Sequence, residues 1–193
     1  MPRSGEDARR RLQQAALELF GERGYEATTT AEIAARAGVT ERTFFRHFAD
    51  KREALFDGED AFRAVLSDGV LAAPQDLSPI GALLWAFRLV EPMLEENRSF
   101  SGPRAALIAQ TPALQERMRT KTAGLVDALS AALRRRGLEE GAATLAAQVG
   151  MAAFSHAAGA WFADPKLGLD AHLTRAFDAL HDLSSTGRAP RRG

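Results

Sequence analysis

Apolar residues recur every three or four positions along most of the chain, and no stretch shows the alternation of a β-strand. The first such stripe spans residues 6–23 and ends at Gly24, which can adopt the left-handed conformation that often closes a helix. A proline directly after a capping residue marks two further helix starts, at residues 78–79 and 111–112. These signals predict an all-α protein of about nine helices.

Residues 28–51 are predicted to form two short helices joined by a tight turn. Thr29 and Glu32 make a capping box at the start of the first helix, Gly38 ends it, and Thr40 caps the second. Small and aromatic residues mark the buried side of the pair: Ile33, Ala34, Ala37, Phe44 and Phe48. A small residue, a turn glycine and a large apolar residue at these intervals predict a helix-turn-helix, whose second helix enters the major groove of DNA.

The next helix is expected to start after Asp50, where Asp50 and Glu53 make a second capping box. It contains Gly58 in its interior and carries an apolar stripe: Leu55, Phe56, Phe62, Val65, Leu66 and Val70. Its first half would complete the helix-turn-helix domain and its second half would enter another core. We therefore expect this helix to be the mechanical link between two domains.

The run 8–55, including GYEATTTAEIAARAGVTERTFFRHFADKREAL, resembles the DNA-binding domain of the TetR family of bacterial transcriptional regulators. The resemblance implies a regulator that binds double-stranded DNA. At Phe45 the family usually has tyrosine, and phenylalanine leaves an apolar contact, for example with a thymine methyl group. Glu41 could accept a hydrogen bond from cytosine or lie in solvent. The resemblance also implies phosphate contacts from Thr28, Thr29, Thr30, Thr40, His47 and Lys51, base contacts from Arg42 and Thr43, and either kind of contact from Arg46.

The composition is that of a globular protein of one or two domains: 193 residues, of which 46% are hydrophobic and 26% charged. The absence of cysteine excludes disulfides and thiolate metal sites. The first residues are charged and lack the apolar run of a secretory signal, and polar residues interrupt the longest apolar-biased stretch, 142–162. We therefore expect no membrane segment and a cytoplasmic location.

The formal net charge is zero, so any affinity for DNA must come from a local basic surface. Arginines and a lysine surround the predicted helix-turn-helix, and Arg9, Arg10 and Arg11 open the first helix. The three N-terminal arginines could form a solvated face or reach phosphate. Binding through such a surface should weaken steeply as salt is added.

The chain is predicted to contain a DNA-binding domain at 1–52, a ligand-binding and dimerisation domain at 53–183, and a disordered basic tail at 184–193. Residues 97–102 are expected to be a connection. The helices expected in the second domain, after the shared one, are 78–96 with a kink or end at Pro92, 103–108, 112–136, 138–162 and 170–183.

The helix pattern of the second domain resembles the ligand-binding domain of the same family. Its last two long helices would pair with their copies in a homodimer through Ala146, Gly150, Ala153, Ala157, Leu173, Phe177 and Leu180. Pocket candidates, each also explained as plain core, are Phe62, Leu66, Trp85, Leu89, Met93, Phe100, Arg104, Leu107, Met118, Phe154 and Trp161.

The pattern of the pocket candidates predicts a small apolar effector. Arg104 and Arg117 could bind an anionic group on it. The segment LIAQTPALQERMR is similar to an actinobacterial branch of the family linked with acyl-CoA recognition, so the effector could be acyl-CoA-like.

No residue pattern indicates an enzyme, a metal site or a cofactor. The sequence lacks HExxH and a glycine-rich phosphate loop, and His172 and His181 are placed on opposite sides of one helix. His156 is better explained as a core or interface residue than as a ligand.

The sequence therefore predicts a ligand-responsive transcriptional regulator, first of all a repressor on a near-palindromic operator. The alternative is a helical ligand-binding protein whose helix-turn-helix no longer binds DNA and which acts through protein partners. Repressor and activator are not separated by sequence.

Overall fold

The computed structural model describes residues 3–164 and 166–185. This part of the chain contains ten α-helices, one short 3₁₀-helix and no strand, so the all-α prediction is confirmed. The chain divides into two compact units. Unit 1 is Met1–Glu59 with Glu96–Lys121, and unit 2 is Asp60–Glu95 with Thr122–Gly193. The predicted boundary at residue 52 stays a prediction, since unit 1 extends to Glu59 and takes in a second segment.

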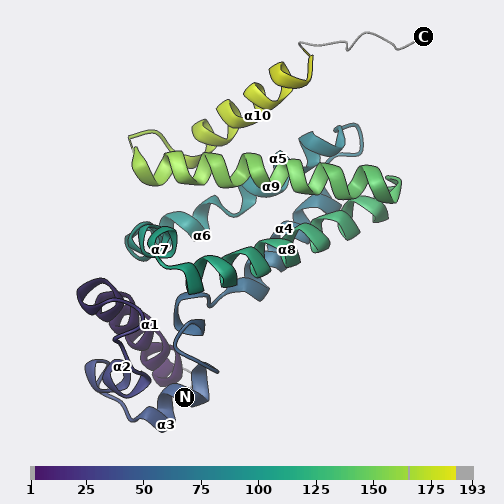
Figure 1. Ribbon diagram of the computed structural model, residues 1–193. Helices are drawn as coiled ribbons and strands as arrows, with labels where there is room; N and C mark the ends of the chain where they lie inside the picture. Colours follow the sequence, from purple (N-terminus) through teal and green to yellow (C-terminus); the bar gives the residue numbers. More distant parts are fainter. Residues whose placement is uncertain (1–2, 165, 186–193) are drawn as a thin grey trace. The chain divides into compact units, whose positions relative to one another are not determined.

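Unit 1 is built around the first helix, α1 (Arg3–Arg23), which packs against α2 (Thr30–Arg36) and α3 (Glu41–His47) (Figure 1). The 3₁₀-helix η1 (Glu53–Leu55), α7 (Arg98–Gln110) and the first part of α8 (Pro112–Arg135) complete it. One apolar cluster fills this unit, with its largest fully buried members Leu12, Leu19, Phe20, Ile33, Phe44, Leu55 and Leu114.

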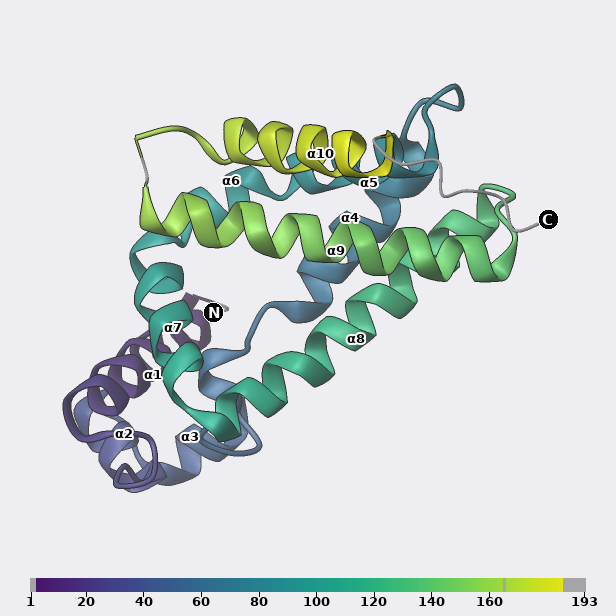
Figure 2. The same cartoon turned by 45° about the horizontal axis from the view of Figure 1, so that its top comes forward.

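Unit 2 contains α4 (Glu59–Ala72) from its second residue, α5 (Pro79–Leu89), most of α6 (Glu91–Glu96), the rest of α8, α9 (Glu140–Ala163) and α10 (Leu169–Ser185). Helix α9 packs against both α5 and α10, and α10 lies along α9 (Figure 2). The rings of Phe87 and Phe154 stack with centroids 4.6 Å apart in the core of the unit. Gly150 allows close packing, because an added Cβ there would lie 2.7 Å from Leu83 Cδ1.

The prediction of one continuous helix after Asp50 is wrong. Gly58 has a φ of 81°, which is left-handed, so it separates η1 from α4 instead of lying inside one helix. The second capping box is also not formed. Asp50 does accept the N–H groups of Arg52 and Glu53, at 2.7 and 3.2 Å, but the Glu53 carboxylate binds Arg117.

The predicted connection at residues 97–102 is wrong as well, because α7 begins at Arg98 and contains Pro103. The Asn97 carbonyl accepts the N–H groups of Phe100 and Ser101, which starts the helix before the proline. Pro103 then omits only the hydrogen bond of its own missing N–H. The helix predicted at 78–96 does end its regular part near Pro92, as α5 stops at Leu89 and α6 follows.

At the C-terminal end, α10 extends through Ser185, two residues into the predicted tail. The tail residues after Ser185 lie outside the described part of the chain. None of the described helices combines the length and the apolar character needed to cross a membrane.

Candidate nucleic-acid interface

The local signals of the helix-turn-helix are confirmed. The Thr29 hydroxyl accepts the Glu32 N–H at 3.2 Å, and the Thr29 N–H donates to the Glu32 carboxylate at 2.9 Å, which makes the capping box at the start of α2. Gly38 has a φ of 68° in the turn. The Thr40 hydroxyl accepts the Thr43 N–H at 3.3 Å and caps α3.

Helix α3 has one buried side and one exposed side. Phe44 is completely buried, and Phe48, which follows the helix, is 4% exposed. Arg42, Phe45 and Arg46 lie on the opposite side because they are three and four residues apart. We call these three residues the recognition face.

The recognition face is available for binding. The Phe45 ring is 53% exposed. Within the described residues, neither Arg42 nor Arg46 forms an ion pair or a side-chain hydrogen bond. Two guanidinium groups and a phenyl ring are therefore presented to solvent by an α-helix, an element that the major groove is wide enough to admit.

Two predicted phosphate contacts point inward. Thr28 is 1% exposed and its hydroxyl donates to the Gly24 carbonyl at 2.9 Å. The Lys51 ammonium donates to the carbonyls of Tyr25 and Thr28, at 2.7 and 3.0 Å, and lies 4.3 Å from the centroid of the Tyr25 ring. Both side chains fasten the connection between α1 and α2, a role that local sequence signals do not reveal.

Other predicted contacts are held within the motif. The Thr30 hydroxyl donates to the Glu41 carboxylate, so the first residues of α2 and α3 are joined. The hydroxyls of Thr43 and Thr40 lie 3.1 Å apart and share a hydrogen bond. Thr29 and Thr40 are exposed and remain candidates for phosphate contacts.

His47 ends α3 in an unusual environment. Its Nε2 atom is buried and has no hydrogen-bond partner among the described residues. Burial, followed by the positive charges of Arg46 and Arg9, lowers the pKa of His47 from its usual value of 6.5, while Asp57 acts in the opposite direction. Burial and the neighbouring positive charges therefore favour the neutral imidazole.

The N-terminal arginines already have local partners. Arg9 forms an ion pair with Asp57, and its guanidinium lies 5.5 Å from the centroid of the Phe48 ring. Arg10 pairs with Asp7 at 2.6 Å. The solvated-face interpretation thus describes Arg10 better than Arg9, which helps to pack residues near the end of α3.

The predicted pocket residues are divided between the two units. Phe100, Arg104, Leu107 and Met118 belong to unit 1 and the others to unit 2. Trp85 and Leu89 have exposed side chains, at 41% and 45%. Leu66, Phe154 and Trp161 are buried, and Phe62 and Met93 are half-buried. The pocket itself stays a prediction.

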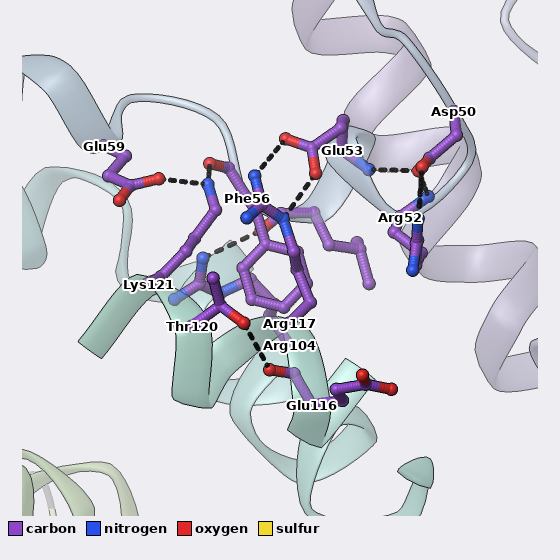
Figure 3. Close-up of polar contacts among 11 residues, drawn as sticks. Asp50, Arg52, Glu53, Phe56, Glu59, Arg104, Glu116, Arg117, Thr120 and Lys121 are labelled. Carbon is purple, nitrogen blue, oxygen red and sulfur yellow. Dashed lines mark hydrogen bonds and ion pairs between the residues drawn. The ribbon is translucent and has the colours of Figure 1, made fainter. Parts of the chain in front are cut away.

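The two arginines proposed for an anionic group have protein partners instead. Arg104 donates to the Leu55 carbonyl at 2.8 Å. Arg117 binds both oxygens of Glu53, at 2.6 and 3.1 Å (Figure 3).

The predicted dimer residues fall into two groups. Gly150, Ala157, Leu173 and Phe177 are buried within the chain itself. Ala146, Ala153 and Leu180 are half-buried. The predicted interface leaves out two exposed apolar side chains on the same helices, Leu145 at 61% and Leu183 at 79%. The interface stays a prediction.

Comparison with known proteins agrees with this geometry. Residues 12–57 match the family model described as bacterial regulatory proteins of the tetR family, and residues 77–184 match the one described as the MftR C-terminal domain. The second match alone covers more than half of the chain. The chain belongs to the TetR family. Its helix-turn-helix is thus the DNA-binding module of a transcriptional regulator.

Named relatives of this TetR-family chain are regulators. MftR of Mycobacterium tuberculosis, named as a candidate regulator of mycofactocin biosynthesis, is 26% identical over 93% of this chain and 96% of its own length. TcmR of Streptomyces glaucescens is 40% identical over 82 residues, which span 42% of this chain and 36% of that protein. Both are named transcriptional regulators, and neither name indicates an enzyme.

One solved structure of the TetR family is similar over nearly the whole chain. FadR of Thermus thermophilus, described as a transcriptional repressor in complex with lauroyl-CoA, is 27% identical with a TM-score of 0.56. The similarity covers 96% of this chain and 99% of FadR. FadR is thus a repressor of similar fold whose structure contains a bound acyl-CoA.

Proposed function

We propose that this chain is a repressor that binds a near-palindromic operator as a homodimer and leaves it when a small apolar effector binds. The observation that carries the proposal is the recognition face of α3, where Arg42, Phe45 and Arg46 are exposed opposite the buried Phe44. Among the described residues, neither arginine has an ion-pair partner or a side-chain hydrogen bond.

The recognition face supplies chemistry suited to base edges. A guanidinium can donate to both O6 and N7 of guanine, and a phenyl ring can contact the methyl group of thymine. The proposal assigns the guanine contact to Arg42 and the thymine contact to Phe45. Thr43 would contact a base next to them, and Arg46 would contact a base or a phosphate. Thr29 and Thr40 are exposed in the same motif, and the proposal gives them, together with the half-buried Thr30 and His47, the sugar–phosphate backbone.

A homodimer would present two such faces to one side of the duplex. Half-sites are then one helical turn apart, about 34–36 Å, and the operator repeats the two-fold symmetry of the protein. Helices α9 and α10 are the proposed interface because they carry the exposed Leu145 and Leu183 beside small residues. Apolar side chains of this size favour burial against a second copy. The chain would act in the cytoplasm.

The effector is proposed to be acyl-CoA-like because FadR, bound to lauroyl-CoA, is similar over nearly the full length. The candidates for lining its apolar part are the aromatic and aliphatic residues of the predicted pocket. Release from DNA requires that the effector binds the DNA-free state more tightly than the DNA-bound state.

The test is selection of bound fragments from genomic DNA, followed by fluorescence anisotropy at two salt concentrations. We expect one enriched near-palindrome, bound much more tightly than random DNA and more weakly at higher salt. Arg42→Ala should reduce the preference for the operator, mainly at one base pair, while size-exclusion chromatography still reports a dimer. Weak and equal binding to all fragments would instead favour a ligand-binding protein that has lost DNA recognition.

A titration of the operator complex with lauroyl-CoA tests the effector. Loss of anisotropy with lauroyl-CoA, and none with coenzyme A alone, is the expected result. A promoter carrying the selected operator ahead of a reporter separates the two modes of action, since a repressor lowers expression and an activator raises it.

A further inference from the structure

The segment that follows the helix-turn-helix, residues 50–59, is held by charged side chains from later in the sequence. We call it the link segment. It contains η1, the completely buried Leu55, the nearly buried Phe56 and the left-handed Gly58. At its start, Asp50 accepts N–H groups of Arg52 and Glu53 and pairs with the Arg52 guanidinium at 2.7 Å. Figure 3 shows these contacts together with those made from α7 and α8.

The first contact joins η1 to α8. Arg117 binds Glu53 through two parallel hydrogen bonds, at 2.6 and 3.1 Å. The two side chains are 30% and 25% exposed, so the pair is partly shielded from water. Two-point contact between a guanidinium and a carboxylate fixes orientation as well as distance. Glu53 raises the pKa of Arg117 through this hydrogen bond, against the opposing effect of burial.

The second contact lies one turn further along α8. Lys121 is only 8% exposed, and its ammonium pairs with Glu59 at 2.7 Å and donates to the Phe56 carbonyl. The same ammonium lies 5.1 Å from the centroid of the Phe56 ring. A lysine so buried needs such partners, since an unpaired ammonium out of water is strongly unfavourable.

The third contact comes from α7. Arg104 donates to the Leu55 carbonyl at 2.8 Å and lies 5.8 Å from the centroid of the Phe56 ring. Its Nε atom is buried and has no hydrogen-bond partner among the described residues. Phe56 is therefore contacted by cations from two helices, Arg104 of α7 and Lys121 of α8.

Apolar side chains would fix this segment with less desolvation. Replacing a buried ion pair by well-packed apolar residues is often neutral or stabilising, so the three cations are poorly explained by stability alone. Charged, directional contacts restrict the link segment to one geometry, which apolar contacts do not.

The continuity of the helices also favours α8 over α4 as the helix that carries the link segment. The left-handed Gly58 interrupts the chain between η1 and α4, so α4 is not a continuous rod with the link segment. Helix α8 runs without a break from Pro112 to Arg135, and the division between the two compact units falls inside it, after Lys121. The helix after Asp50, predicted to be the mechanical link, is interrupted at Gly58, so it does not join the two units as one continuous helix.

We propose that Arg104, Arg117 and Lys121 are positioning residues for DNA recognition: they fix the link segment and make α8, rather than α4, the helix that sets the orientation of α2 and α3. This rests on the proposed function. Both recognition faces of a dimer must meet their half-sites at once, so a loose link segment lowers affinity for the operator. Random DNA imposes no such spacing, so a loose link segment by itself leaves affinity for random DNA unchanged and only the altered charge affects it.

The experiment is a charge-swap cycle on full-length protein, with the operator selected by the unmodified chain and random DNA of equal length as probes. Glu53→Arg and Arg117→Glu should each weaken operator binding roughly tenfold, and the double variant should restore it to within about threefold. The matched control is Arg119→Glu, which makes the same charge change on an exposed residue of α8.

The sign of the Glu53→Arg effect is decisive. A general electrostatic effect predicts tighter binding, because the change adds positive charge near a polyanion. The positioning role predicts weaker operator binding in spite of it. Unchanged or tighter binding by Glu53→Arg overturns the proposal, and so does a double variant that folds but recovers nothing. If the charge reversals unfold the chain, Glu53→Gln and Arg117→Gln replace them. With these variants, an equal loss of affinity for the operator and for random DNA overturns the proposal. Failure of the unmodified chain to select any operator would count against the proposed function instead.

Discussion

The hydroxyl of Thr30, at the first residue of α2, donates a hydrogen bond to the carboxylate of Glu41, at the first residue of α3. This contact spans the turn of the helix-turn-helix and joins the starts of its two helices. A carboxylate engaged in this way helps to set the angle between the helices and is less available to accept from cytosine.

Glu41→Ala should therefore weaken binding to every DNA sequence alike and leave base preference intact. The expected loss is about two- to tenfold, because a net hydrogen-bond contribution is roughly 0.5–1.5 kcal/mol. Glu41→Gln keeps an acceptor for Thr30 and should bind almost as the unmodified chain does. Fluorescence anisotropy with the operator and its single-base variants measures the affinity and the base preference of each variant. A changed preference at one C·G pair would mean that Glu41 reads a base after all.

Arg42 should behave in the opposite manner. Arg42→Ala is expected to cost about 1–3 kcal/mol of operator binding and to relax selectivity at one base pair, because a two-point contact with guanine is lost. Arg42→Lys should recover little of this, since an ammonium does not reproduce the planar fork. A uniform loss over all sequences, with a smaller dependence on salt, would instead place Arg42 on a phosphate.

The capping box of α2 gives a stability prediction. Thr29→Ala should lower the free energy of unfolding by about 1 kcal/mol, because the Glu32 N–H loses its side-chain acceptor. Thr29→Ser keeps the hydroxyl and is the control. Urea unfolding followed by circular dichroism measures the difference. Equal losses from the two variants would show that the hydroxyl is not the stabilising group.

The same capping box predicts a dependence on acid. Hydrogen bonds from the Thr29 backbone and side chain, with a smaller effect of Arg23, lower the pKa of Glu32 below its usual value of 4.5. The folded carboxyl therefore binds its proton less readily than the unfolded one. Its stabilisation is present above pH 4.5 and is lost as the pH falls through the lowered value. Glu32→Gln should flatten that part of the curve of unfolding free energy against pH.

His47 should add a second pH dependence, at higher pH. Its pKa is lowered by burial and by Arg46 and Arg9, so the unfolded chain takes up the proton first as the pH falls. Stability is complete above the usual value of 6.5 and declines as the pH falls toward the lowered one. His47→Gln should remove the decline. Nuclear magnetic resonance titration of the ring protons gives the pKa directly, and a value above 6.5 would contradict the structure.

Two glycines of α9 form a matched pair. At Gly150 an added Cβ would lie 2.7 Å from the completely buried Leu83, whereas at Gly159 it would meet nothing within 4 Å. Gly159→Ala should stabilise the chain by up to about 1 kcal/mol through helix propensity. Gly150→Ala should destabilise it by about 1–3 kcal/mol through overpacking. Equal effects in urea unfolding would contradict the close packing of α5 and α9.

Sequence was informative where the interacting groups are neighbours in the chain. The contacts of Thr29, Gly38 and Thr40 lie within four residues, so their roles could be predicted from the pattern alone. Glu53 shows where this ends. The local pattern predicts a capping box with Asp50. In the structure the Glu53 carboxylate instead forms an ion pair with Arg117, which lies 64 residues away.

Burial was the other property that periodicity could not supply. Trp85 and Leu89 belong to a broad apolar surface in the sequence, but both side chains are exposed on α5. Thr28 and Lys51 are polar and near the recognition face, but both are used inside the motif. A narrow apolar stripe identifies the buried side of a helix, whereas a broad one does not show which of its residues are buried.

The left-handed Gly58 marks a position where the chain can accept insertions and deletions more easily than inside a helix. In an α-helix each added residue advances everything beyond it by 1.5 Å and turns it by about 100°. One extra residue in the middle of α8 would therefore twist its two ends out of phase. Next to Gly58 no helical phase exists to be disturbed, because the helix has already ended. Related chains should thus vary in length beside residue 58 and keep the length of α8 constant.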